Sequence, residues 1–287
     1  MRVVVSGLNN YVGSRCTGLM GDEDFHVFAI ARNVPLFQSR VFEPIVAELC
    51  EIDLMRADFA VKEQLPDMHA AYYFTQVPTL DDKVNMNLEL LCLRNYIHLI
   101  HHMHCNRLIY VARLMDKGCI APILELFREC NVDYTVVLKS SVIGKGSLID
   151  KVIKHMAGKK VMLYSRYYLT REFKPLGVRD FVGWLKRLLN VDAFHHKVVE
   201  VGGNEAFSLR GLYKLYIKLE LLQGKTRFVR MPAPIMSLFY RSRLSRASVD
   251  FEELDRFISF ERETDSTWQQ DAPFAFSPME KVLREDR

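Results

Sequence analysis

The stretch that decides the fold is residues 3–13 at the N-terminus, which reads VVVSGLNNYVG. Its first three residues are valines, which favour a short buried strand, and the Ser6-Gly7 pair after them indicates a tight turn. A helical pattern over residues 11–20 follows directly. This strand–turn–helix order directs backbone N–H groups and the positive end of a helix towards one point, where an anionic diphosphate can bind.

The two glycines of this stretch have different expected roles. Gly7 is expected to make the tight turn, and Gly13 to let the helix pack closely on the sheet. Asn10 stands where a G-x-x-G-x-x-G pattern has its middle glycine, and Asn tolerates left-handed backbone angles better than other non-glycine residues. The turn can therefore form with a side chain at position 10 that crowds the phosphates. The residues predicted to bind the cofactor here are Gly7, Asn9, Asn10, Tyr11, Val12 and Gly13. The alternative is a strand–turn–helix that binds no ligand.

The rest of the first half alternates between strand and helix patterns. Strands are expected at residues 25–31, 46–52, 70–74, 107–112 and 133–138, with helices at 58–64, 80–104 and 122–130. Such alternation predicts βαβ units with right-handed crossovers and a parallel sheet. The predicted fold class is therefore α/β: a doubly wound parallel sheet of the Rossmann type, whose ligands bind at the carboxyl ends of the strands.

Beyond residue 140 the pattern is less regular. Helices are expected at residues 147–156, 180–189 and 209–222, with a strand at 198–201. We expect a dinucleotide-binding domain over residues 1–140, a smaller C-terminal substrate lobe over 141–263 that is partly interleaved with the sheet, and a tail over 264–287. Because the tail is polar and contains prolines, we expect it to be loosely attached.

Composition restricts the class of protein. The 287 residues are 49% hydrophobic and 26% charged, which excludes fibrous and disordered chains. The net charge of +4 is spread along the chain, so we predict that the protein does not bind nucleic acid. We predict a small-molecule ligand instead, and an anionic one is compatible with this charge. No apolar stretch reaches the ~18–20 residues of a transmembrane span, and no signal peptide is recognisable. The six cysteines form no C-x-x-C pair, which favours a reducing, cytoplasmic location.

Two charged residues at the ends of later strands refine the prediction of which ligand binds. Arg32 follows the second strand, where an adenosine ribose would lie, and an Arg there accommodates the 2′-phosphate of NADP. Asp53 ends the third strand, near the expected adenine amino group. The alternatives are a solvated surface Arg and a helix N-cap, respectively. The predicted cofactor is NADP, with NAD as the alternative.

In their order and spacing, these motifs resemble the atypical short-chain dehydrogenase/reductase (SDR) superfamily, in its NmrA-like or epimerase-like branch, over most of the chain. The matching pieces are the 6–13 turn, Ala31-Arg32, Asp53-Leu54, RLIYV at 107–111, SVIGKG at 141–146, PLGVRDFVGW at 175–184 and VEVGG at 199–203. The resemblance implies an NAD(P)-binding oxidoreductase. It places ribose and adenine near Arg32, Asp53 and Leu54, and the nicotinamide near the ends of the fourth and fifth strands, including Thr75 and Gln76.

The acid–base residues typical of SDR enzymes are missing from the sequence. Those enzymes use a Tyr-x-x-x-Lys pair, in which the Lys lowers the Tyr pKa, together with a Ser after the fifth strand. None of the 12 tyrosines has Lys four positions later, and residues 111–114 read VARL. The catalytic residues are therefore unassigned. Three hypotheses remain: an NADP(H)-dependent oxidoreductase, a non-catalytic NADP(H)-binding regulatory or assembly protein, and a scaffold that has lost its ligand. A homodimer or a protein partner is compatible with each.

Three further clusters are interpreted conservatively. His98, His101 and His102 share a helix face, but no carboxylate stands at ligand spacing, so no metal site is predicted. The basic, aromatic stretch at 154–168 is suited to stacking on bases or, as we favour, to lining a lobe for an anionic ligand. The basic pattern at 238–246 indicates either a helix on a membrane surface or, as we favour, a docked helix.

Overall fold

The computed structural model describes residues 1–41, 43–56, 65–164, 169–224, 226–230, 253–254, 256–259 and 264–286. It divides into two compact units, which are considered separately. Unit 1 comprises Met1–Lys139, Val182–Val201 and Asp265–Phe274, and unit 2 comprises Ser140–Phe181, Gly202–Thr264 and Ala275–Arg287. The helix expected at 58–64 and the basic helix expected at 238–246 lie outside the described residues, as does the end of the 154–168 stretch.

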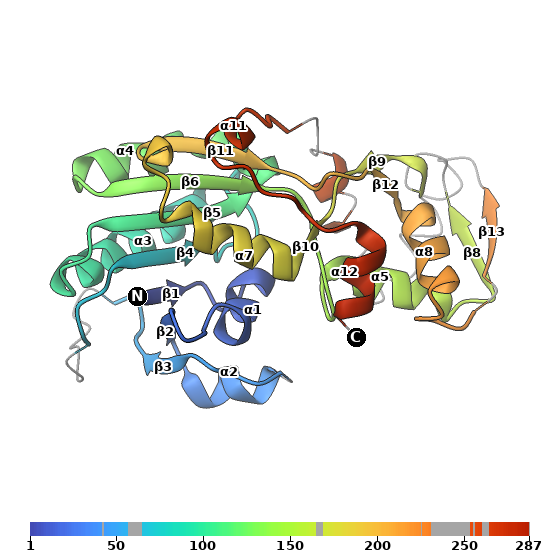
Figure 1. Cartoon of the computed structure of the whole chain (residues 1–287), viewed down its shortest axis with the longest axis horizontal. Coiled ribbons are helices and arrows are strands. Elements are labelled where there is room, and N and C mark those ends of the chain that lie inside the picture. Colours follow the sequence, from blue (N-terminus) through green and yellow to red (C-terminus); the bar gives the residue numbers. More distant parts are fainter. Residues whose placement is uncertain are drawn as a thin grey trace. The chain divides into compact units, whose positions relative to one another are not determined.

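Unit 1 is built on a seven-stranded sheet with the order β11-β6-β5-β4-β1-β2-β3 (Figure 1). Every neighbouring pair of strands in it is parallel. The strands are β1 (Arg2–Ser6), β2 (His26–Ala31), β3 (Glu48–Glu51), β4 (Ala70–Phe74), β5 (Arg107–Arg113), β6 (Asp133–Lys139) and β11 (Lys197–Val201). The first six strands have the order of the doubly wound Rossmann fold. The predicted fold class is therefore confirmed.

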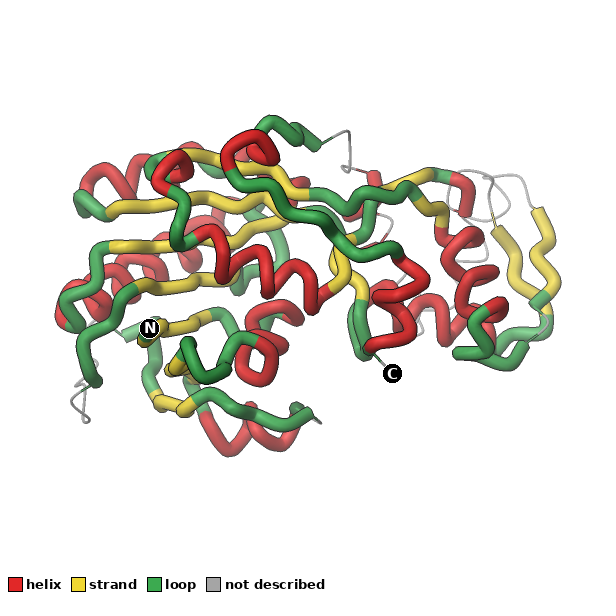
Figure 2. Tube along the Cα trace, viewed as in Figure 1, coloured by secondary structure: helices red, strands yellow, loops and turns green. Residues whose placement is uncertain are grey.

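Helices cover both faces of this sheet, which explains its apolar strands (Figure 2). Successive strand residues point to opposite faces. Tyr73 contacts Tyr96 of α3, with ring centroids 5.3 Å apart, whereas the Tyr72 hydroxyl donates to the Leu185 carbonyl of α7 at 3.0 Å. Helices α3 and α7 therefore lie on opposite faces. The helices are α1 (Tyr11–Leu19), α2 (Val34–Arg40), α3 (Lys83–His102), α4 (Ala121–Glu129), α7 (Val178–Leu188) and α11 (Trp268–Asp271), with short 3-10 segments at Leu114–Cys119 and Asp192–Phe194.

Helix α2 was not predicted from the sequence. It has only seven residues, of which Phe37 alone is buried, so it offers little apolar periodicity. Its start is nevertheless well defined, because the Asn33 side chain accepts a hydrogen bond from the Leu36 amide and a proline stands in the first turn.

Unit 2 has its own apolar core, which is formed by helices and three short two-stranded sheets. Its elements are α5 (Leu148–Ala157), α8 (Leu209–Lys218), α12 (Met279–Glu285), β7 (Val142–Ile143), β8 (Val161–Tyr164), β9 (Glu172–Phe173), β10 (Leu176–Gly177), β12 (Phe207–Ser208) and β13 (Arg227–Arg230). Strand β7 pairs with β10, β8 with β13, and β9 with β12. The SDR resemblance implied a strand within residues 141–146, where β7 lies, and the other short strands were not predicted.

The C-terminal segment is packed, so its expected loose attachment is wrong for the described residues 264–286. In unit 1 the ring of Trp268 is buried against Trp184, with centroids 5.3 Å apart. In unit 2 the α12 residues Met279, Val282 and Leu283 are buried in the core. The prediction based on composition was wrong because a few apolar residues at helical spacing anchor a segment whose remaining residues are polar.

Candidate functional site

The turn after β1 depends on its two glycines. Gly7 has φ of +89°, and a Cβ there would collide with the Phe74 carbonyl oxygen of the neighbouring strand. A Cβ at Gly13 would lie 2.5 Å from the Gly7 carbonyl oxygen. The expected structural roles of Gly7 in the tight turn and of Gly13 in close packing are thus present in unit 1.

Asn10 caps the helix that follows this turn. Its Oδ1 accepts from the Val12 amide at 3.0 Å, and its Nδ2 donates to the Thr75 carbonyl at 3.2 Å. Its backbone is extended, with φ of −77° and ψ of 138°, so the expectation that it tolerates the site through left-handed angles is wrong. Asn is instead suited to this position as an N-cap.

An anion fits the start of α1 in charge and in donors. The first intrahelical hydrogen bond runs from the Ser14 amide to the Asn10 carbonyl, so the amides of Tyr11, Val12 and Gly13 precede it. The first turn contains no acidic residue. A diphosphate would reach the Val12 amide only after the Asn10 side chain turns away, which costs about 1 kcal/mol, as for loss of an ordinary N-cap.

A second charged group lies at the ends of β2 and β3. Arg32 Nε lies 3.5 Å from Asp53 Oδ2, and Arg56 Nε lies 3.6 Å from the same oxygen. The two Arg side chains are 71% and 75% exposed, so both can reorient towards a ligand. Two guanidinium groups beside one carboxylate leave a net positive charge that suits a phosphate. Sequence reasoning missed Arg56, which lies beyond the third-strand motif.

Asp53 and its surroundings limit how that phosphate is bound. Asp53 Oδ1 accepts from the Met55 amide at 3.1 Å, so the carboxylate holds a turn as well as both Arg residues. Glu51 Oε2 accepts from the Val34 amide at 3.0 Å and occupies the start of α2. A phosphate here would therefore be held by guanidinium groups and not by helix amides. Leu54, also predicted to contact cofactor, is buried, and its carbonyl accepts from Asn95.

At the carboxyl end of β4, the predicted cofactor residues turn their side chains into the protein. The Thr75 hydroxyl lies 3.1 Å from both the Tyr110 hydroxyl and the Val111 carbonyl. Gln76 Nε2 donates to the Tyr73 hydroxyl at 3.1 Å. A ligand at this edge would therefore meet the backbone of residues 75–77 before it met these polar side chains.

A buried carboxylate, which sequence reasoning missed, lies below this edge. Glu89 of α3 is 0% exposed, and it accepts from the Tyr110 hydroxyl at 3.1 Å and from the Gln76 amide at 3.2 Å. Burial raises the pKa of Glu89 to about 7. Hydrogen bonds from the Gln76 amide, the Tyr110 hydroxyl and the Val77 amide, together with the charge of Arg113, only partly oppose this rise. The signal in the sequence was an acidic residue amid apolar ones in a long helix.

An ion pair follows β5, where the SDR resemblance places the nicotinamide. Arg113 Nε lies 2.7 Å from Asp116 Oδ2, and Arg113 Nη2 lies 3.1 Å from Oδ1. Asp116 is 2% exposed, and Arg113 also donates to the Pro78 carbonyl. This bidentate pair was not predicted, and it ties the end of β5 to the segment after β4.

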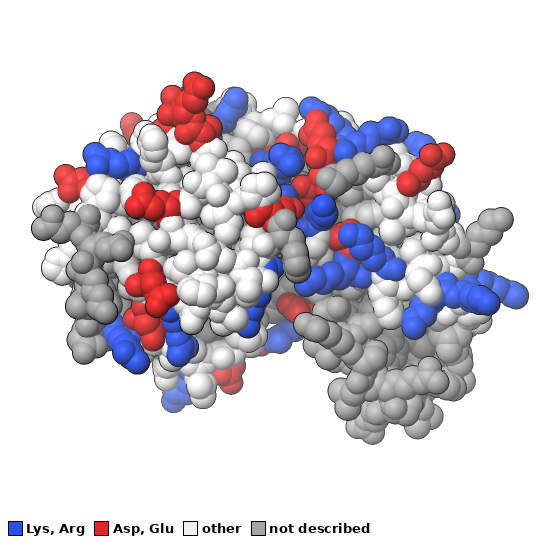
Figure 3. Space-filling view, turned by 90° about the horizontal axis from the view of Figure 1, so that it is seen from below, with Lys and Arg blue, Asp and Glu red and all other residues white. Residues whose placement is uncertain are grey.

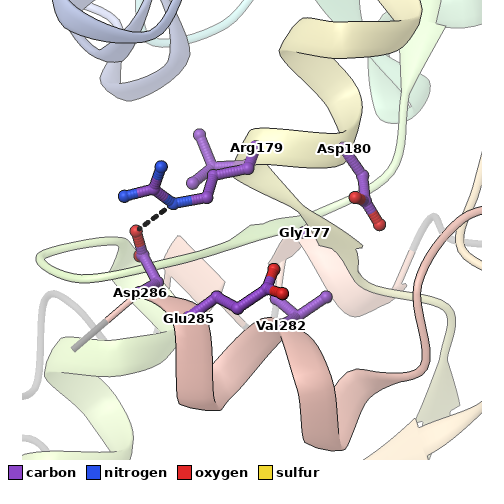
Figure 4. Close-up of a pocket in the computed structure, with 7 residues that line it drawn as sticks. Gly177, Arg179, Asp180, Val282, Glu285 and Asp286 are labelled. Atoms are coloured by element: carbon purple, nitrogen blue, oxygen red, sulfur yellow. Dashed lines mark ion pairs between the residues drawn. The ribbon is translucent and has the colours of Figure 1, made fainter.

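Unit 2 contains a separate shallow hollow between α12 and residues 178–181, the part of α7 that belongs to this unit. Its lining includes Gly177, Arg179, Asp180, Val282, Glu285 and Asp286 (Figure 4). Arg179 and Asp286 point towards each other, with Nε 3.6 Å from Oδ1. Asp180 instead accepts hydrogen bonds from the backbone and side chain of Ser277. With three carboxylates and one guanidinium, this hollow does not suit a phosphate.

Charge is distributed unevenly along the chain. Unit 2 has more Lys and Arg than Asp and Glu, whereas unit 1 has an acidic excess. Figure 3 shows many Lys and Arg side chains, in blue, towards the right of the view, the side on which Figure 1 places α8 and β13. Among the described residues, no three His, Cys, Asp or Glu side chains come close enough to hold a metal ion. In the same residues, no helix has both the length and the apolar character to cross a membrane.

Comparison with solved structures identifies the fold, although no protein-family model and no curated protein sequence matches the chain. A triphenylmethane reductase of Citrobacter sp., solved with NADP(H), is 10% identical, with a TM-score of 0.67 over 100% of both chains. A nucleoside-diphosphate-sugar epimerase of Staphylococcus aureus is 10% identical, with a TM-score of 0.64 over 99% of this chain and 100% of the other. The chain has the fold of these epimerases and reductases.

A third structure extends this result. The UDP-glucuronic acid 4-epimerase of Bacillus cereus, in complex with UDP-glucuronic acid and NAD, is 13% identical, with a TM-score of 0.60 over 90% of this chain and 99% of the other. The resemblance to SDR proteins is therefore confirmed at the level of the fold. Because SDR-type folds serve several reactions, the function has to be argued from the residues at the site.

Proposed function

We propose that unit 1 binds NADP(H) at the carboxyl edge of its sheet and that the protein is an NADP(H)-dependent oxidoreductase acting on a small molecule. The observation that carries this proposal is the pair of exposed guanidinium groups, Arg32 and Arg56, beside Asp53. They follow β2 and β3 at the same edge of the parallel sheet as the start of α1. One ligand with a diphosphate and a separate phosphate suits both positive groups.

Each part of the edge has a task in this proposal. The first amides of α1 bind the diphosphate, and Arg32 and Arg56 bind the 2′-phosphate, while Asp53 holds both Arg side chains nearby. The backbone of residues 75–77 orients the nicotinamide half. When bound, the cofactor supplies the hydride chemistry that no side chain can perform. The group that donates the proton is not assigned.

Calorimetric titration with NADPH and NADH tests the cofactor. Replacing Arg32 and Arg56 together by Ala should weaken NADPH binding by about 10- to 100-fold, the loss expected for charge-assisted hydrogen bonds. NADH, which lacks the 2′-phosphate, should bind as before. Arg40→Ala provides the control, because Arg40 is an exposed Arg at the end of α2.

The outcomes of this titration distinguish a failure of the 2′-phosphate assignment from a failure of the cofactor proposal as a whole. Equal loss of NADPH and NADH affinity in the double variant would remove the 2′-phosphate role from these two residues. If neither dinucleotide binds to the unmodified protein, the cofactor proposal itself fails.

A second candidate function, non-catalytic NADP(H) binding in a regulatory or assembly protein, is favoured by the end of β5. No Tyr-x-x-x-Lys pair occurs in the sequence, and the Arg113–Asp116 pair satisfies the charges that follow this strand. Incubation with NADPH and a panel of carbonyl and enone substrates distinguishes the two functions. Sustained NADPH consumption supports the oxidoreductase. Binding without turnover, together with a protein partner whose capture changes with NADP(H), supports the alternative.

A further inference from the structure

A chain of buried hydroxyl groups connects Glu89 to the carboxyl end of β4. In one direction the Thr75 hydroxyl donates to the Tyr110 oxygen, and the Tyr110 hydroxyl donates to Glu89 Oε1, each at 3.1 Å. Glu89 Oε2 accepts from the Gln76 amide at 3.2 Å. Glu89, Thr75 and Tyr110 are 0%, 3% and 0% exposed, so water does not compete for these bonds.

The same atoms can satisfy their hydrogen bonds with Glu89 either ionised or neutral. With a proton on Oε1, Glu89 donates to the Tyr110 oxygen, Tyr110 donates to Thr75 Oγ1, and the Thr75 hydroxyl donates to the Val111 carbonyl, which lies 3.1 Å away. The Glu89–Tyr110 and Tyr110–Thr75 bonds reverse direction, and the Thr75 hydroxyl changes its acceptor from Tyr110 to the Val111 carbonyl. No heavy atom has to move. The network therefore accommodates one proton without leaving a buried polar group unsatisfied.

The two states differ in how firmly they hold the backbone. An ionised carboxylate is a stronger acceptor for the Gln76 amide than a neutral acid. The adjacent Thr75 carbonyl accepts from Asn10 Nδ2, and Asn10 Oδ1 accepts from the Val12 amide. A continuous chain of contacts thus leads from Glu89 through residues 75 and 76 to the cap of α1.

We propose that Glu89 is a positioning residue whose ionisation clamps residues 75–77, and through Thr75 the Asn10 cap, at the carboxyl edge of the sheet. The clamp is a property of unit 1 itself. Its effect on ligand affinity rests on the proposed binding of NADP(H).

The groups around Glu89 set the pH at which the clamp changes. Tyr73 of β4, Tyr110 of β5 and Cys92 of α3 are neutral partners, and burial raises the pKa of each above its ordinary value. The charged group that favours ionisation of Glu89 is Arg113, which Asp116 pairs. Because burial dominates, the pKa of Glu89 rises to about 7, within the range where most proteins work.

Amide hydrogen exchange of the intact protein tests the clamp without any ligand. After correction for intrinsic exchange, peptides that contain Gln76 and Val77 should become protected by at least about threefold between pH 6 and pH 8, because the charged acceptor is stronger. Glu89→Gln, which resembles the protonated state, should show equal protection at both pH values. Glu125→Gln, at an exposed position of α4, should behave as the unmodified protein does.

A second variant keeps the test valid if Glu89→Gln fails to fold. Tyr110→Phe removes the hydroxyl that donates to the carboxylate, so the midpoint of the protection change should rise by about one pH unit. A pH-independent protection of residues 76–77 in the unmodified protein, or an unchanged midpoint in Tyr110→Phe, would overturn the clamp.

NADPH titration at pH 6 and pH 8 then tests the link to the ligand. The ratio of the NADPH dissociation constants at pH 6 and pH 8 should be the same in the unmodified protein and in Glu125→Gln. In Glu89→Gln this ratio should differ from theirs by about threefold or more. Matching profiles in all three proteins would contradict the link. If NADPH does not bind at all, the proposed function fails, while the exchange measurement still decides the clamp.

Discussion

The two halves of the candidate site in unit 1 use their polar groups in opposite ways. At the ends of β2 and β3 the Arg32 and Arg56 side chains are 71% and 75% exposed, and at the start of α1 the Val12 amide is capped by the Asn10 side chain. At the ends of β4 and β5, Glu89 and Asp116 are buried and hydrogen-bonded within the protein. The side chains of the first half can turn towards a phosphate at a small cost in free energy, whereas those of the second half hold the backbone.

This difference bears on what the protein does. Breaking a buried ion pair such as Arg113–Asp116 leaves an uncompensated charge and costs roughly 3–5 kcal/mol. A reaction that needed either partner as a free acid or base would therefore begin from an unfavourable state. Binding at the first half and rigidity at the second are both consistent with a cofactor whose own chemistry does most of the work.

The largest expected effect of a substitution at this edge is on folding. Gly7→Ala places a Cβ against the Phe74 carbonyl in a backbone conformation with positive φ, so we expect a loss of about 4 kcal/mol or more in the free energy of unfolding. Urea denaturation measures it. Gly118→Ala is the matched control, because a Cβ there meets nothing within 4 Å. Similar stability of the two variants would show that the turn can relax.

The next effect comes from the other half of the site and depends on pH. Because the pKa of Glu89 is raised from 4.5 to about 7, the folded protein holds a proton between these pH values that the unfolded chain releases. Stability should therefore fall as pH rises from about 4.5 to 7, by up to about 3 kcal/mol, and then level off. Urea denaturation across this range in the unmodified protein and in Glu89→Gln isolates the contribution. Parallel curves would contradict it.

The geometry of the turn before α1 was predictable from the sequence because its residues are close together in the chain. The strand, Gly7 and Gly13 lie within one short segment, and their spacing alone requires a close backbone approach. Arg32 could be placed because it directly follows a strand. Arg56 could not, because its distance from Asp53 depends on a turn that the Asp53 carboxylate itself holds.

The other half escaped prediction for a different reason. Glu89 and Tyr110 are separated by a helix end and a strand, and their contact depends on the rotation of α3 about its axis. Periodicity identifies the buried face of such a helix but not which strand residue it meets. Asn10 was identified as unusual, yet its extended backbone and its bond to Thr75 follow from the neighbouring strand β4.

Asn10 connects the two halves of the site through its bonds to Val12 and Thr75, and substitutions there should have modest effects. Asn10→Ala should lower stability by about 1 kcal/mol and Asn10→Gly by only a few tenths, as at other N-caps. If a diphosphate uses the Val12 amide, Asn10→Gly should bind NADPH up to about fivefold more tightly, since the ligand no longer displaces the Oδ1 cap.

Asn190→Gly is the control for this change, because Asn190 is an exposed Asn in the turn after α7 and is not part of the proposed site. If Asn10→Gly instead binds NADPH more weakly than Asn190→Gly does, the Asn10 amide is itself a contact to the ligand. The cap and the ligand would then share one side chain, and a bound phosphate would reach residues 75–77 through the bond between Asn10 and Thr75. In that case the half that binds and the half that clamps would respond to a ligand together.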